Sequence, residues 1–235
     1  MRRSSAEDFR GTLGDVARLG FEAVELFDLH GHAAENVRGW LDELGLVVCS
    51  RHTRLEAIES DLDSLAAEAE TLGVRRLVVA WIEPPATEAD ADAVHRRLAS
   101  AAAAAGERGL ELGFHNHDAE VRPLDGGRTF LDGLPPDVFT ELDLGWIWWA
   151  GLDPLALLER FSGRSPLVHV KDFRNRDERS YCAVGDGAVG YEQVAPAAVK
   201  SGAEWLLIEF DEPDRSELED AERSIAALRR MLAAA

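Results

Sequence analysis

The stretch Leu41–His52 reads LDELGLVVCSRH and contains the junction between a helix and a strand. Leu41 and Leu44 lie on the apolar side of an amphipathic segment, and Gly45 suits the left-handed cap that often ends a helix. The apolar run that begins at Leu46 has the length and composition of a parallel strand buried on both faces. This stretch therefore predicts a helix, a glycine and a strand in that order.

The same order recurs along the whole chain. Predicted strands cover Ala23–Phe27, Leu46–Ser50, Leu77–Trp81, Leu110–His115, Phe139–Leu144, Leu167–Lys171 and Trp205–Phe210. Predicted helices cover Ala6–Leu19, Ala33–Leu44, Leu55–Leu72, Glu88–Arg108, Leu152–Arg160, Tyr191–Lys200 and Glu217–Ala234. Such alternation is typical of βα units around a parallel sheet.

The number of predicted strands is compatible with two α/β architectures. A flavodoxin-like open sheet usually has about five or six strands, whereas a (β/α)₈ TIM barrel has eight and typically ~250 residues. This chain has 235 residues, seven predicted strands and a helix at its start. The chain is therefore either an open sheet with an unusual number of strands or a single TIM-barrel domain over residues 1–235 that lacks the first strand.

Composition limits the partners and the setting. The net charge of −19 opposes binding to nucleic acid, which needs Lys and Arg to neutralise phosphates. No apolar run approaches the ~20 residues of a membrane span, and no apolar leader follows Arg2 and Arg3. Two cysteines cannot form a zinc cluster, so a reducing cytoplasm is the expected setting. A homo-oligomer remains open.

Polar residues end most of the predicted strands, and strand ends carry the active sites of such barrels. These residues are Glu25, His52, His115, His117, Asp143, His169, Lys171 and Glu209. Among them Asp143, His169 and Glu209 form a mixed nitrogen and oxygen set that suits Mn²⁺, Mg²⁺, Co²⁺ or Zn²⁺. The competing interpretation is that each is a hydrogen-bonded polar residue at a strand end. Three such residues together favour the metal interpretation.

Histidines and tryptophans near these ends allow several interpretations. His115 and His117 face the same side of a strand, and each is a candidate metal ligand, acid/base or hydrogen-bond partner of a neighbouring strand. His95 lies in a helix between charged residues and is expected to be solvated. Trp146 is expected to wall the pocket, whereas Trp148 and Trp149 are expected at the barrel rim.

The ordered set of segments resembles a known family. The segments are DFRGTLGDVARLGFEAVEL, LDELGLVVCSRH, FHNHDAE, ELDLGWIWWAGLDP, LVHVKDF, VGDGAVGYEQV and EWLLIEFD. Together they resemble the sugar phosphate isomerase/epimerase family of xylose isomerase-like barrels. The resemblance favours the barrel that lacks its first strand, because that family usually has a strand ahead of the segment DFRGTL. The resemblance implies a divalent cation held by a Glu, an Asp, a His and a second Glu. Asp143, His169 and Glu209 match the last three, whereas His115 lies near the first position, with Glu120 as the alternative.

The resemblance also implies an activity. Relatives include inosose dehydratases, tagatose 3-epimerases and hydroxypyruvate isomerases, so we expect a sugar or polyol substrate and an enediolate intermediate. Glu209 and His115 are then the candidate acid/base residues, and Glu25, His52 and Lys171 are expected to line the pocket with His117 and Trp146. Two alternatives are a non-catalytic sugar-binding barrel and an endonuclease IV-like phosphodiesterase. The charge and the small number of strand-end histidines oppose the phosphodiesterase.

Overall fold

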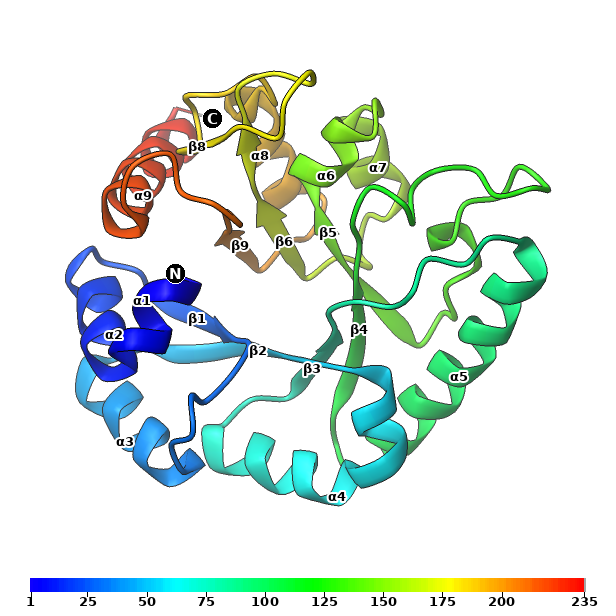
Figure 1. Ribbon diagram of the computed structural model, residues 1–235, viewed down its shortest axis with the longest axis horizontal. Coiled ribbons are helices and arrows are strands. Elements are labelled where there is room, and N and C mark those ends of the chain that lie inside the picture. Colours follow the sequence, from blue (N-terminus) through cyan, green and yellow to red (C-terminus); the bar gives the residue numbers. More distant parts are fainter. Residues whose placement is uncertain (235) are drawn as a thin grey trace.

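A computed structural model describes residues 1–234 of the chain. Within them, helices surround a seven-stranded parallel sheet that curls into a nearly closed ring (Figure 1). Its strands are β1 (Ala23–Leu26), β2 (Val47–Thr53), β3 (Arg76–Val79), β4 (Glu111–His115), β5 (Val138–Asp143), β6 (Leu167–Val170) and β9 (Trp205–Ile208). The predicted barrel fold with seven strands is confirmed.

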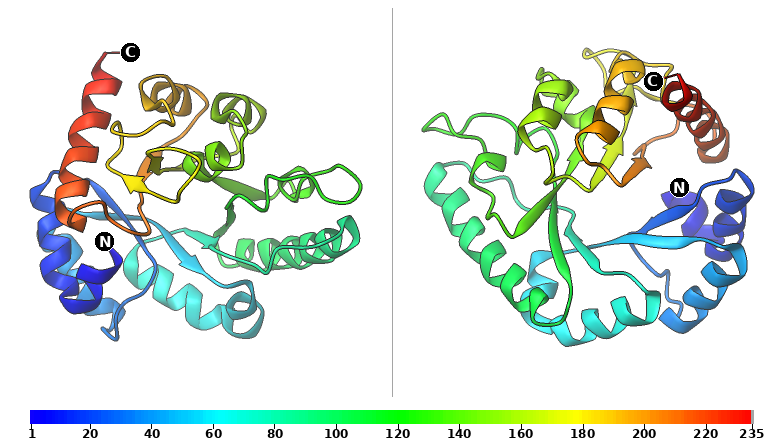
Figure 2. Two further views of the ribbon diagram at one scale, coloured as in Figure 1. Left: turned by 45° about the horizontal axis from the view of Figure 1, so that its top comes forward. Right: turned by 180° about the vertical axis from the view of Figure 1, so that it is seen from behind.

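Each strand pairs with the next one in the order β1-β2-β3-β4-β5-β6-β9. No ladder joins β1 to β9 in residues 1–234, so the ring has an open seam between them. Figure 2 shows the seam from two further sides, with the N-terminal helices beside it. All six ladders are parallel, which places the carboxyl ends of the strands on one rim of the barrel.

The helices of residues 1–234 lie outside the sheet. They are α1 (Arg2–Glu7), α2 (Phe9–Arg18), α3 (Ala34–Leu44), α4 (Leu55–Leu72), α5 (Glu88–Gly106), α6 (Leu144–Trp149), α7 (Pro154–Arg160), α8 (Tyr191–Lys200) and α9 (Glu217–Ala233). α3 and α4 end at Gly45 and Gly73, whose φ angles of 68° and 73° are the predicted left-handed caps. A short antiparallel pair, β7 (Asp172–Phe173) and β8 (Tyr181–Cys182), projects beyond β6.

Two of the differences between the predicted and the observed elements have a clear local cause. The predicted helix Ala6–Leu19 is divided at Asp8, whose side chain accepts a hydrogen bond from the Gly11 amide and caps α2. The predicted strand Phe139–Leu144 ends at Asp143, because the Asp143 side chain accepts from the Trp146 amide and starts α6. In both places a short-range aspartate cap changes the direction of the chain.

The predicted solvation of His95 is wrong. Its side chain in α5 is buried, and Nε2 lies 3.0 Å from the carbonyl oxygen of Phe130. The two rings are 4.4 Å apart between centroids. Burial lowers the pKa of His95, so the ring is held in its neutral form. The loop around the 3₁₀ turn Leu131–Gly133 covers this face of α5, and no local pattern in α5 reveals that contact.

Candidate metal centre

The interior of the barrel has an apolar layer below a polar one. Alternate residues of a strand point to the same face, so β5 directs Phe139, Glu141 and Asp143 inward. Phe139 belongs to an apolar cluster whose other members are Ala23, Cys49, Val78, Leu167, Trp205 and Leu207. The polar layer above it, toward the carboxyl ends of the strands, contains Glu25, His52, His115, Glu141, Asp143, His169 and Glu209. Parallel strands thereby gather acids and imidazoles at one end of an apolar barrel.

Four of these residues form a candidate metal centre. Candidate ligand atoms of His115, Asp143, His169 and Glu209 all lie within 4.8 Å of one another. Nδ1 of His169 is 2.9 Å from Oε2 of Glu209, which is only partly buried, whereas Asp143 is fully buried. Oδ2 of Asp143 is buried and makes an ion pair with Lys171 but no hydrogen bond. Two carboxylates and two imidazoles are a set of ligands that fits a divalent cation.

A buried ammonium lies against the acidic side of this centre. Nζ of Lys171 is 3.2 Å from Oδ2 of Asp143 and 3.1 Å from both Oε2 of Glu209 and Oδ2 of Asp211. Burial disfavours the charge, but the three carboxylates outweigh it and raise the pKa of Lys171. Burial would raise the pKa of Glu209, but the positive charges of Lys171 and His169 outweigh burial and hold that pKa well below its usual value. Lys171 and Glu209 are therefore a fixed cation and a fixed anion at neutral pH.

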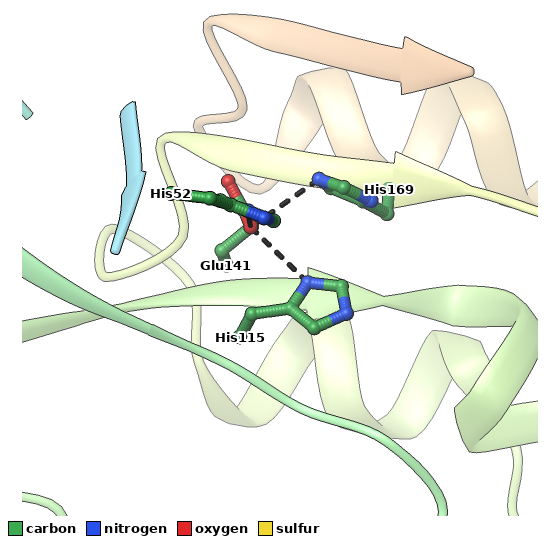
Figure 3. A group of neighbouring side chains, drawn as sticks. All are labelled: His52, His115, Glu141 and His169. Atoms are coloured by element: carbon green, nitrogen blue, oxygen red, sulfur yellow. Dashed lines mark hydrogen bonds and ion pairs between the residues drawn. The ribbon is translucent and has the colours of Figure 1, made fainter. Parts of the chain in front are cut away.

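Glu141 is the central residue that the sequence analysis missed. It is fully buried, and its Oε2 contacts the rings of three histidines from three other strands, His52, His115 and His169 (Figure 3). Burial raises the pKa of Glu141, but these imidazoles outweigh it and hold the pKa well below its usual value. Glu141 lies inside a strand rather than at its end, so a search of strand ends passes over it. Period-two alternation back from Asp143 would have indicated it.

The residues predicted to line the substrate pocket lie around this centre. Nε2 of His52 is 2.9 Å from Oε1 of Glu25, and the charges of Glu25 and Glu141 outweigh burial to raise the pKa of His52 to about 10. The structure therefore places both residues below the metal centre, in the polar layer. Burial and the positive side chains nearby lower the pKa of His117 to about 3, so its ring is neutral.

An aromatic wall that includes Trp146 lies beside His117 and Lys171. Trp146 is buried, 5.8 Å from His117 between ring centroids, and Nζ of Lys171 lies 4.8 Å from the centroid of its ring. Trp148 and Trp149 are partly buried and pack on Phe173. Trp146 is therefore in contact with residues of the site, whereas the other two tryptophans lie farther out.

A cavity of about 200 Å³ connects the polar layer with the open seam. It is lined by apolar residues of β1, β9 and α2 and reaches His52, His169 and Glu209. Arg2 of α1 reaches the same place, with its guanidinium 2.6 Å from Oε1 of Glu209 and 3.5 Å from Oδ1 of Asp211. The first turn of the chain therefore contacts the candidate metal centre, which the sequence analysis did not predict.

Among the described residues, no helix is long and apolar enough to cross a membrane.

Comparison with known proteins identifies the family. Residues 13–231 match the model of the xylose isomerase-like TIM barrel family, and the chain belongs to that family. An inosose dehydratase from Geobacillus kaustophilus is 22% identical over 85% of this chain and 79% of its own length. Another from Bacillus cereus is 25% identical, but that match covers 55% of this chain and only half of that relative.

Solved structures confirm the architecture. A sugar phosphate isomerase/epimerase from Parabacteroides distasonis superposes with a TM-score of 0.83 at 23% identity, covering 98% of this chain and 90% of that one. An L-ribulose 3-epimerase gives 0.74 at 18% identity, with coverage of 98% and 90%. A xylose isomerase-like TIM barrel protein from Mycobacterium smegmatis in complex with magnesium gives 0.68 at 17% identity, with coverage of 97% and 89%.

Proposed function

We propose that the protein is a divalent-metal-dependent isomerase or epimerase, or an inosose dehydratase-like lyase, acting on a sugar, a sugar phosphate or a keto-polyol. The observation that carries this proposal is the group of two carboxylates and two imidazoles at the carboxyl ends of four strands. The relatives named as inosose dehydratases and an L-ribulose 3-epimerase, together with the magnesium complex of a structural neighbour, support it.

Asp143, His169, Glu209 and His115 are the residues that would hold the cation. A bound divalent ion would supply positive charge opposite the oxygens of an enediolate, which forms when a carbon acid next to a carbonyl loses its proton. Mn²⁺, Mg²⁺, Co²⁺ and Zn²⁺ all accept this mixture of donors. The partial exposure of Glu209 supports access from the mouth of the barrel.

In this proposal Glu209 and His115 are the residues that transfer protons to and from the substrate. Glu209 is ionised at neutral pH and can accept a proton, although its low pKa makes it a weak base in the metal-free protein. The imidazole of His115 can both donate and accept a hydrogen bond, so it would be the second proton-transfer group. The ammonium of Lys171 is held beside both carboxylates and would face the developing negative charge of the substrate.

The remaining predicted site residues would shape the pocket. Trp146 offers an apolar ring to the carbon face of a sugar, and His117 offers a neutral imidazole that can donate or accept a hydrogen bond. Glu25 and His52 lie deeper, so their proposed part is to hold the floor of the pocket.

Elemental analysis of the purified protein, followed by a panel of keto sugars and inososes, tests the proposal. We expect about one divalent ion per chain in the wild type, and loss of both metal and turnover in Asp143→Asn. Asp137→Asn is the matched control, because Asp137 is an exposed carboxylate beside the other end of β5. Unchanged metal content in Asp143→Asn would contradict the proposed metal centre. A wild type without metal would favour a non-catalytic sugar-binding barrel.

A further inference from the structure

We infer that Glu141 is a positioning residue that fixes the orientation and tautomer of His115 and His169, so that both rings present a lone pair to the metal. This inference rests on the proposed metal centre, but it assigns a role to a residue outside that centre. It follows from the contacts of one buried carboxylate oxygen.

Three ring nitrogens converge on Oε2 of Glu141. Nε2 of His52 is 2.7 Å away, Nδ1 of His115 is 3.1 Å away and Nε2 of His169 is 3.2 Å away. The contacts of His52 and His115 have hydrogen-bond geometry. Nε2 of His169 has no such alignment and lies between two carboxylates, 3.2 Å from Glu141 and 3.0 Å from Oε1 of Glu25. In Figure 3 the second ring nitrogen of His115, like that of His169, lies on the side away from Glu141.

The chemistry of imidazole determines which ring nitrogen carries the proton in these contacts. A neutral imidazole carries one N–H donor and one lone pair, and an ionised carboxylate only accepts hydrogen bonds. A ring nitrogen that faces Glu141 therefore carries the proton, which leaves the lone pair on the opposite nitrogen. For His169 the opposite nitrogen is Nδ1, which lies 2.9 Å from Glu209 and would give up its proton to that side when a cation binds there. Histidine ligands of metals commonly donate their other N–H to a carboxylate in this way.

A rival arrangement uses the same residues differently. Candidate ligand atoms of His52, His115, Glu141 and His169 also lie within 4.8 Å of one another, and Oε1 of Glu141 has no hydrogen-bond partner. Because a neutral imidazole has one lone pair, His115 and His169 cannot be ligands in both groups at once.

We call the group with Asp143 and Glu209 the upper group and the group with His52 and Glu141 the lower group. Access and charge favour the upper group as the metal site. Every member of the lower group is buried, so a cation there would have no open position for a substrate oxygen. His52 is also tied to both Glu25 and Glu141, and these two acids are the counter-ions of its charged ring. The lower group therefore has the composition of a supporting network.

Metal affinity and the Co²⁺ absorption spectrum test this inference. We expect Glu141→Gln to bind Co²⁺ and Mn²⁺ about 10- to 100-fold more weakly than the wild type and to show an altered Co²⁺ spectrum at saturation. The amide keeps the size of the side chain but loses the negative charge and replaces one acceptor oxygen with an NH₂ donor. Glu141→Asp keeps the carboxylate, so it should recover part of the affinity.

Glu111→Gln is the control, because Glu111 is an exposed glutamate at the opposite end of β4 from His115. Its affinity and spectrum should equal those of the wild type. Wild-type affinity and spectrum in Glu141→Gln would overturn the inference while leaving the metal centre intact. Complete loss of binding in Glu141→Gln, with binding retained in Asp143→Asn, would also overturn it, because the lower group would then hold the ion. A wild type that binds no metal would instead refute the proposed function.

Discussion

Cys49 and Cys182 have thiols that the fold keeps protonated. Both side chains are buried, and burial, reinforced by acidic neighbours, raises the pKa of each thiol to about 12. At pH 8 the thiolate fraction of each is then on the order of one in ten thousand. We expect neither cysteine of the native protein to react with a thiol-specific disulfide reagent within an hour, and both to react at once in denaturant. Rapid modification of one thiol in the native state would contradict this burial.

Single residues also show how much of the candidate site can be predicted from the sequence. Asp143 and His169 were predicted as a pair because each follows an apolar run at a strand end, and the structure brings them together. Glu141 was missed because a charged residue inside a buried strand has no local signal except its period-two relation to Asp143. His95 was misjudged for the opposite reason, since its burial depends on a loop about 35 residues farther along the chain.

At the scale of elements, β4 and β5 approach each other through a glycine. A Cβ atom added to Gly113 would lie 2.2 Å from Cε2 of Phe139, on the facing strand. Gly113→Ala should therefore lower the free energy of unfolding by about 1–3 kcal/mol, because the interior layer has no room for the methyl group. Urea unfolding at equilibrium measures this change.

A double variant checks the cause of that loss. In Phe139→Ala the ring is gone, so adding Gly113→Ala to it should cost much less than in the wild type. Equal costs in the two backgrounds would show that the ring is not the obstacle. Gly14, which lies in α2 with open space around it, provides a control position for a Gly→Ala change.

The order of the elements was predictable, but some of their ends were not. Helix–glycine–strand repeats fix the alternation of α and β segments, and the seven strands follow from it. The short helix α6 was not predicted, because nothing in the run after Asp143 except the aspartate itself marks a helix start. Caps of this kind depend on one side chain that bends back to its own backbone.

At the scale of the whole molecule, stability without metal should fall as the pH rises. The pKa of His52 is 6.5 in an unfolded chain and about 10 in the fold, where burial is outweighed by Glu25 and Glu141. Below 6.5 both states hold this proton, whereas between the two values only the folded state holds it. The free energy of unfolding therefore falls with pH in this interval, by about 1.4 kcal/mol per pH unit for one such proton.

Urea unfolding in the presence of a chelator, from about pH 8 to about pH 9.5, measures the slope. The amino terminus works against the slope at the lower end of this window, because burial lowers its folded pKa from 8.0 while the unfolded chain still loses that proton there. His169 contributes in the same direction, because its pKa is also raised. His52→Gln should show a shallower slope than the wild type. A wild-type stability that is flat or rises over this window would contradict the charged state of the buried histidine.

The contact of Arg2 with Glu209 has a practical consequence for anyone who handles this protein. Met1 is partly buried and, like Arg2, lines the cavity that reaches Glu209. A peptide joined ahead of Arg2 would leave the fold beside the candidate metal centre. A tag after α9, whose last turn is exposed, would leave from the outer surface. Metal affinities and reaction rates of differently tagged preparations should therefore be compared only when the tag is at the same end.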